Sequence, residues 1–76
     1  MNKKRRDALR VAIDHLDEAL EIVDSARFDE KYAFKSLTEG LQNTERGEAM
    51  EEAIDNLMDA RYSIKDAKRS IGLAIE

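Results

Sequence analysis

In the stretch AIDNLMDARYSIKDAKRSIGLA, residues 53–74, alanine recurs at every seventh position, and larger apolar residues alternate with it at spacings of three and four. Residues 12–37 repeat this pattern, with Glu30 as the polar exception among the larger partners. The alanines are Ala12, Ala19, Ala26, Ala33, Ala53, Ala60, Ala67 and Ala74, and the larger partners are Leu16, Val23, Leu37, Leu57, Ile64 and Ile71. Alternation of small and large residues lets two helices approach closely. We therefore expect the alanine columns to form the seam between two helices.

The first helix is predicted to cover residues 3–38, because this range contains neither glycine nor proline and its apolar residues follow helical spacing. Its weakest point is residues 25–29, where large apolar residues leave the seam and a serine offers the backbone a competing hydrogen bond. We expect the helix to continue through this point. Gly40 is expected to stop it by taking the left-handed conformation just after the last turn.

A second helix is predicted over residues 45–75, capped at its start by Asn43 or Thr44. Several glutamates lie in its first turns, where the positive end of the helix dipole stabilises negative side chains. With a turn at residues 39–44, the two helices have similar lengths and pack antiparallel. The chain is thus predicted to be a single all-α domain, residues 1–76, with the fold of a long helical hairpin.

Self-association is expected because a 76-residue chain hides only about 60% of its unfolded surface and two packed helices bury one stripe each. A second apolar stripe flanks the alanines, and more apolar residues lie beyond it. The stripe contains Ile13, Leu20, Phe34, Leu41, Met50, Ile54 and Ile75, and the outer residues are Val11, Ile22, Phe28, Tyr32, Met58, Tyr62 and Leu73. We expect a second copy to cover this surface, giving a four-helix-bundle dimer or a higher oligomer.

Composition argues against several classes of protein. The chain has no cysteine for a disulfide or a thiolate metal site, and His15 is its single histidine. His15 precedes Glu18, the reverse of the Glu-x-x-His order of di-iron bundles, and Gly40, Gly47 and Gly72 lack phosphate-loop spacing. No window resembles a signal peptide or a membrane span. We therefore expect a cytoplasmic, non-enzymatic protein without catalytic residues, metal or cofactor.

The net charge of -4 disfavours general nucleic-acid binding, but the antiparallel fold is expected to separate the charge into two poles. The two chain ends carry eight basic and four acidic side chains, a local balance of +4, and the remainder carries -8. The basic residues at the ends are Lys3, Lys4, Arg5, Arg6, Arg10, Lys65, Lys68 and Arg69. This pole is a candidate anion site, although the same residues could simply complement the dipole of the second helix.

Other cations have two interpretations each. Arg27, Arg61 and Lys68 interrupt the second stripe, where their stems could cover apolar surface while their heads reach Glu30, Asp24 or solvent. Alternatively, they could line a bundle and bind an anion. Arg46 lies in the capping segment 43–47, which can either cap the second helix or meet a phosphate.

Residues 41–57, LQNTERGEAMEEAIDNL, resemble a group of short proteins of Firmicutes phages and prophages with the signature Ser/Thr-Glu-Arg-Gly-Glu-Ala-Met. The resemblance implies a phage setting, host cytoplasm and a helical hairpin. A fainter similarity runs to the helical-hairpin domain of phage proteins that sequester cyclic-nucleotide immune signals, through Arg46, Glu48, residues 57–60 and Tyr62.

These patterns lead us to expect a non-enzymatic, self-associating, phage-type counter-defence protein that captures an anionic nucleotide at a basic site between subunits. The candidate ligand-binding residues are Arg5, Arg6, Arg10, Lys65, Lys68 and Arg69, with Arg46, Arg61 and Tyr62 as further candidates. One alternative is an inhibitor of a host defence protein, such as an anti-CRISPR-like or nucleic-acid-mimicking decoy. It would use one of two surfaces. The first is an acidic stripe formed by Glu48, Glu51, Glu52, Asp55 and Asp59. The second is an aromatic and methionine surface formed by Phe28, Tyr32, Met58 and Tyr62. A purely structural or regulatory dimer is the third possibility.

Overall fold

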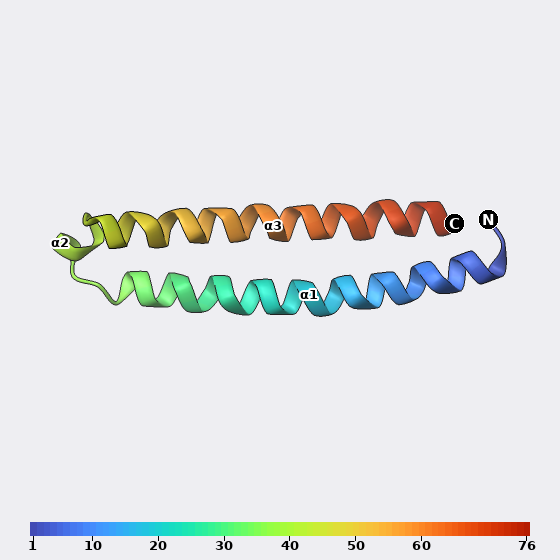
Figure 1. Cartoon of the computed structure of the whole chain (residues 1–76), viewed down its shortest axis with the longest axis horizontal. Helices are drawn as coiled ribbons and strands as arrows, with labels where there is room; N and C mark the ends of the chain where they lie inside the picture. The colour runs from blue at the N-terminus through green and yellow to red at the C-terminus, as the bar shows by residue number, and fades with distance from the viewer.

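A computed structural model describes all 76 residues and contains helices but no strands. Two long helices, α1 (Lys3–Lys35) and α3 (Glu45–Ile75), run antiparallel side by side, and a short helix, α2 (Glu39–Gln42), lies in the connection between them (Figure 1). The Cα atoms span 58 × 15 × 13 Å, so the molecule is a rod two helices wide. The predicted all-α class and helical hairpin are confirmed.

Asn2 caps the start of helix α1, because its side-chain oxygen accepts a hydrogen bond of 2.9 Å from the Arg5 backbone N–H. It continues without a break through residues 25–29, as expected for a range without glycine or proline. The prediction that it reaches residue 38 is wrong, because the helix ends at Lys35. The Ser36 hydroxyl and backbone N–H both donate to the Tyr32 carbonyl oxygen, which satisfies the last turn locally.

The turn differs from the expectation built on Gly40. No glycine in the chain has a positive φ angle, and Gly40 lies inside α2 rather than at the end of α1. The Thr38 side chain caps α2 by accepting from the Leu41 backbone N–H, so the chain starts a new helical turn before Gly40 is reached. The left-handed helix stop predicted at Gly40 is therefore wrong.

Gln42 holds the turn to the end of α1. Its side-chain amide donates to the carbonyl oxygens of Phe34, in the last turn of α1, and of Leu37, in the turn, at 3.3 and 3.2 Å. The Gln42 backbone also packs directly against Gly47, the single buried residue of the chain. Gly47 thus allows α2 and the first turn of α3 to touch.

Helix α3 begins where the sequence places it, after Thr44. The Thr44 hydroxyl accepts a hydrogen bond of 3.3 Å from the Gly47 backbone N–H, and Glu45 and Glu48 lie in the first turn. The helix then runs to Ile75.

Replacing Thr44 by alanine is expected to lower the free energy of unfolding by about 1 kcal/mol, because the orphan donor of the first turn loses its acceptor. Urea unfolding followed by far-UV circular dichroism at a fixed protein concentration measures this. Thr38→Ala is the matched control and should cost less, since Thr38 caps a helix of only four residues. Equal losses for the two variants would contradict the assigned role of Thr44.

The contact between α1 and α3 contains the larger partners of the expected seam, but the second stripe, and not the alanine column, lies between them. Ala26, Ala33 and Ala74 are exposed, and the other five alanines are half-buried at the edge of the contact. The half-buried residues with regular spacing are Leu9, Ile13, Leu16, Leu20, Val23, Arg27, Glu30, Phe34 and Leu37 in α1, and Met50, Ile54, Leu57, Arg61, Ile64, Lys68, Ile71 and Ile75 in α3. Large side chains from both helices bury more apolar area in this contact than alanines would. Leu41, expected in the stripe, is exposed.

The hairpin has no buried apolar side chain, so even its seam residues keep contact with solvent. Its accessible surface is 5767 Å², whereas a compact protein of 8.7 kDa exposes about 4,700 Å². The pair of helices is therefore incompletely covered along its length.

Candidate functional site at the basic end

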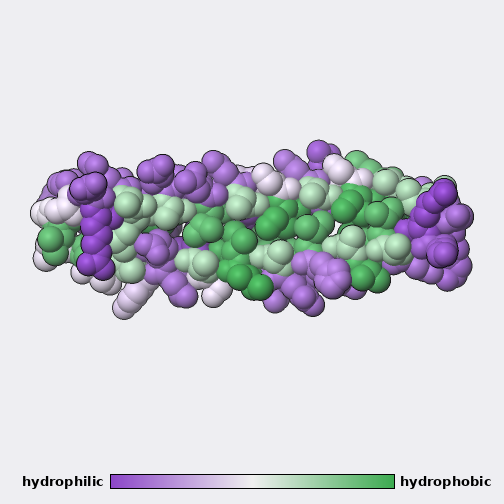
Figure 2. Space-filling view, in the orientation of Figure 1, coloured by the Kyte–Doolittle hydropathy of each residue, from purple (hydrophilic) through white to green (hydrophobic).

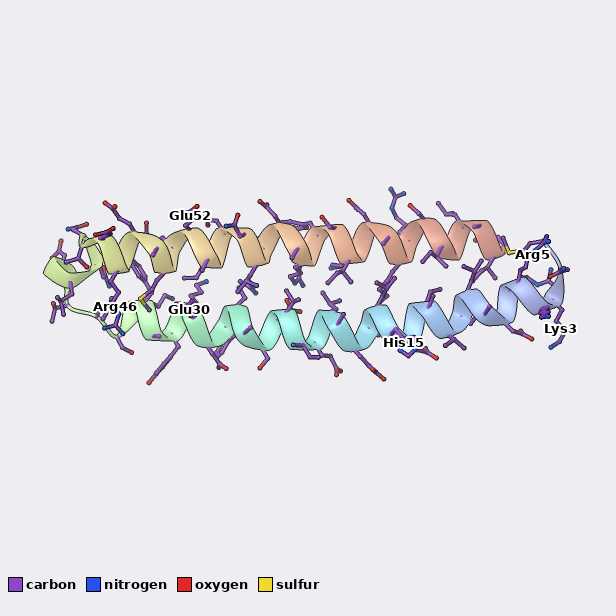
Figure 3. All side chains as sticks on the ribbon, viewed as in Figure 1. Lys3, Arg5, His15, Glu30, Arg46 and Glu52 are labelled. Carbon is purple, nitrogen blue, oxygen red and sulfur yellow. The ribbon has the colours of Figure 1, made fainter.

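The two chain termini lie beside each other at one end of the rod (Figure 1). Residues 1–14 and 65–76 therefore meet there, and we call this region the basic end. It carries eight basic and four acidic side chains, a balance of +4. Lys3 and Arg5 project from this end, while Arg46 lies at the opposite end beside the turn (Figure 3). The antiparallel packing of two helices of similar length is what gathers these charges.

On the α1 side, Asp7 holds two of the cations. Its carboxylate accepts from Lys3 Nζ at 2.7 Å and from an Arg10 guanidinium nitrogen at 3.0 Å. All three side chains are about half exposed or more, so these ion pairs contribute little to stability and open easily for a ligand. The half-buried Arg6 donates to the Met1 carbonyl oxygen, whereas the Arg5 side chain is exposed and takes part in no ion pair.

On the α3 side, Tyr62, Lys65 and Arg69 follow one another at spacings of three and four and thus lie along one strip of the helix. All three side chains are exposed, and neither cation takes part in an ion pair. This strip combines two cations for phosphate oxygens with an aromatic ring on which a base can stack.

Two candidate residues are committed to the hairpin itself. Lys68 forms an ion pair with Asp17, and Arg61 Nε lies 2.8 Å from Asp24 Oδ1. The Arg61 and Asp24 atoms are enclosed, but the N–H group is not directed at the oxygen, so the contact is an ion pair without hydrogen-bond geometry. Of the destinations left open for these cations, Glu30, Asp24 and solvent, Arg61 thus takes Asp24.

The two ion pairs also set the register between the helices. Asp17 and Asp24 are one heptad apart in α1, and Arg61 and Lys68 are one heptad apart in α3. Opposite charges repeated at the same period on two antiparallel helices favour one alignment over slipped ones. The heptad spacing of these four residues is visible in the sequence, but Asp17 was not among the partners expected for Lys68.

Arg27 is half-buried in α1, and its enclosed Nε has no hydrogen-bond partner. With Phe28, Lys31, Tyr32 and Lys35 it lines an open depression of about 350 Å³, built from α1 alone. A second depression of about 340 Å³ lies between the helices, where Lys31, Phe34 and Lys35 face Glu51, Ile54 and Asp55. Sequence reasoning singled out neither lysine.

The alternative surfaces are only partly assembled. The exposed rings of Phe28 and Tyr32 share the first depression, but Met58 and Tyr62 are not part of it. The acidic residues of α3 are all exposed, and two of them face the lysines of the second depression. His15 is exposed on α1, and nowhere in the chain do three or more potential metal-ligating side chains converge.

None of the helices is both long and apolar enough to cross a membrane. Comparison of the chain with protein-family models, curated proteins and solved structures found no match.

Proposed function

We propose that this protein is a non-enzymatic, self-associating binding protein of phage type that captures an anionic nucleotide and thereby acts in counter-defence. The observation that carries the proposal is the basic end, where both chain termini bring cations together in a protein of net charge -4. Local positive potential at one end of an acidic rod attracts a small anion without general affinity for nucleic acid.

A nucleotide suits the groups that are free to bind it. Arg5, Lys65 and Arg69 are exposed and unpaired, so their charges are available to phosphate oxygens. Tyr62, 57% exposed, precedes Lys65 by one helical turn and offers a stacking surface for a base.

Self-association follows from the incomplete cover of the two helices. The chain buries no apolar side chain, and large residues such as Ile22 and Leu73 are 70% and 57% exposed. A four-helix-bundle dimer or a higher oligomer removes such surface from water and brings a second chain close to each site.

Charge reversal tests the site. The triple variant Arg5→Glu, Arg6→Glu, Arg69→Glu is expected to lose about 100-fold or more in affinity for the nucleotide that the wild type retains, because several charge-assisted contacts are replaced by repulsion. Native mass spectrometry of protein purified gently from a phage-infected host extract identifies the retained nucleotide, and calorimetry then measures the affinity.

The matched control is Lys31→Glu with Lys35→Glu, which lies outside the basic end and should leave nucleotide affinity unchanged. Tyr62→Ala should weaken binding by about tenfold, since stacking of one base contributes about 1–3 kcal/mol. Tyr32→Ala, also an exposed aromatic, should not. Full retention by the triple variant would overturn the assignment to the basic end.

A protein target is the second candidate, favoured by the depression beside Phe28 and Tyr32, whose side chains are 67% and 70% exposed. An exposed aromatic pair rimmed by cations fits a partner surface of apolar and acidic character. An oligomer that carries no nucleotide from an infected extract would favour this candidate.

A further inference from the structure

The ion pairs of the hairpin mark one of its two broad faces. Asp24 and Arg61 meet on that face, as do Asp17 and Lys68. In α3 the alanines of the column come one residue before the heptad position that Arg61 and Lys68 occupy. One residue step turns about 100° around a helix, so these alanines point away from the face that carries the ion pairs. In α1 the alanine column lies about 160° around the helix from the two aspartates. The alanines of both helices therefore border the opposite face, which we call the alanine face.

The alanine face is nearly free of charge. Its positions follow alternating steps of four and three residues from Ala8 to Ala33 in α1 and from Ala49 to Ala74 in α3. The α1 positions are alanines apart from His15, Ile22 and Asp29, and the α3 positions are alanines apart from Asn56, Ser63 and Ser70. Asp29 is thus the single carboxylate on a face drawn from a chain that is 39% charged. An apolar band along one face of the rod, with hydrophilic ends, is visible in Figure 2.

The hairpin as a whole exposes enough extra surface to form one protein interface. Its accessible area exceeds that of a compact protein of the same mass by roughly 1,000 Å². A stable interface buries about 800 Å² on each partner. Covering the alanine face would also enclose the seam beside it, where Leu16, Val23 and Ile64 are only half-buried.

The charges of the two ends select the direction of the partner. The basic end has a balance of +4, whereas residues 29–52 at the turn carry seven acidic and three basic side chains, a balance of -4. A two-fold axis along the rod would superpose the two basic ends. A two-fold axis across the rod superposes each basic end on the acidic turn of the other copy, which is electrostatically complementary.

We infer that a second copy of this chain docks on the alanine face with its rod reversed, so that α1 packs on the partner's α1 and α3 on the partner's α3. The inference rests on the self-association included in the proposed function and specifies its geometry. The axis passes near the middle of the face, beside Ile22 in α1 and Ser63 in α3, which the ion-pair register places at the same level along the rod. The dimer then has one basic end at each tip, beside the turn of the other chain, while Lys65 and Arg69 stay on the open face that carries the ion pairs, because they follow Arg61 by four and eight residues.

Disulfide trapping tests the direction, and the absence of native cysteine makes single variants unambiguous. Ser63→Cys should form a disulfide-linked dimer on mild oxidation, because residue 63 lies near the axis and faces its own copy. Ser25→Cys, exposed but outside the alanine face, should not. Cross-linking only between Ile22→Cys and Ser63→Cys chains in a mixture would place the axis along the rod and overturn the inferred arrangement, because these two residues lie at the same level of the rod.

Added charge tests the face itself. Ala26→Glu with Ala60→Glu should weaken dimerisation by about 100-fold or more, because unpaired carboxylates would be buried between the copies. Light scattering reports a monomer mass whether the separated chain stays folded or unfolds. Ser25→Glu is the control and should remain dimeric. A double variant that dimerises like the wild type would overturn the alanine face as the interface.

These results separate the interface from the ligand. A dimer that retains nucleotide but tolerates charge on the alanine face contradicts the interface alone. A Ser63→Cys disulfide dimer that binds no nucleotide supports the interface and contradicts the proposed ligand.

Discussion

Gly47→Ala is expected to destabilise the hairpin by about 3 kcal/mol, the largest effect of any single methyl group in this chain. A Cβ atom at Gly47 would lie 2.2 Å from the Gln42 carbonyl oxygen and 2.6 Å from its carbonyl carbon. Both are backbone atoms, and Gln42 is held to the end of α1 by two hydrogen bonds, so it cannot move without loosening the turn. Urea unfolding at a fixed protein concentration measures the loss.

Gly72→Ala is the matched control, because a Cβ atom at Gly72 meets nothing within 4 Å. Gly72 lies inside α3, where alanine is favoured over glycine, so this variant should gain about 0.5–1 kcal/mol. The two substitutions add the same methyl group and are expected to have opposite signs. A Gly47→Ala variant as stable as the wild type would show that the turn packs differently.

Asp24→Ala is expected to cost about 1–2 kcal/mol, because it leaves the enclosed Arg61 Nε without its carboxylate. The cost is kept moderate by solvent, since the side chains of Asp24 and Arg61 are 37% and 28% exposed. Chemical unfolding of the single and double variants in a double-mutant cycle measures the coupling.

Replacing both partners should have a different outcome. Asp24→Leu with Arg61→Leu is expected to be neutral or stabilising, because two apolar side chains extend the seam without leaving a charge behind. Breaking the exposed pair with Lys3→Ala should change stability by no more than about 0.5 kcal/mol. If Asp24→Ala costs no more than Lys3→Ala, the ion pair does not stabilise the register.

The start of α3 could be predicted closely because its determinants are local. Thr44 supplies the cap, and the glutamates that follow suit the positive end of a helix. The end of α1 could not, because Ser36 and Gln42 donate to the carbonyl oxygens of Tyr32 and Phe34 in its last turn, through a connection whose shape depends on α3 packing against Gln42. Gly40 offered a plausible stop, but Thr38 began a new helical turn before it.

The candidate site shows the same division. Gathering of cations at the basic end follows from two antiparallel helices of similar length, and both features can be read from the sequence. The commitment of Lys68 to Asp17 could not be read from Lys68 alone, because it depends on how far one helix slides along the other. Exposure of Lys65 and Arg69 likewise follows from the helix face that turns toward α1.

By itself, the sequence determined that the chain is helical, that two long helices are joined by a short turn, and that charge gathers at opposite ends. These properties depend on composition, capping and heptad period, which act within a few residues. Only the tertiary structure decided which apolar stripe faces the partner helix. The alanine column and the second stripe share one period, so periodicity could not rank them. Ile13, Leu20 and Phe34 take the contact because they bury more apolar area there, and the alanines border it, with Ala26, Ala33 and Ala74 exposed and the other five half-buried.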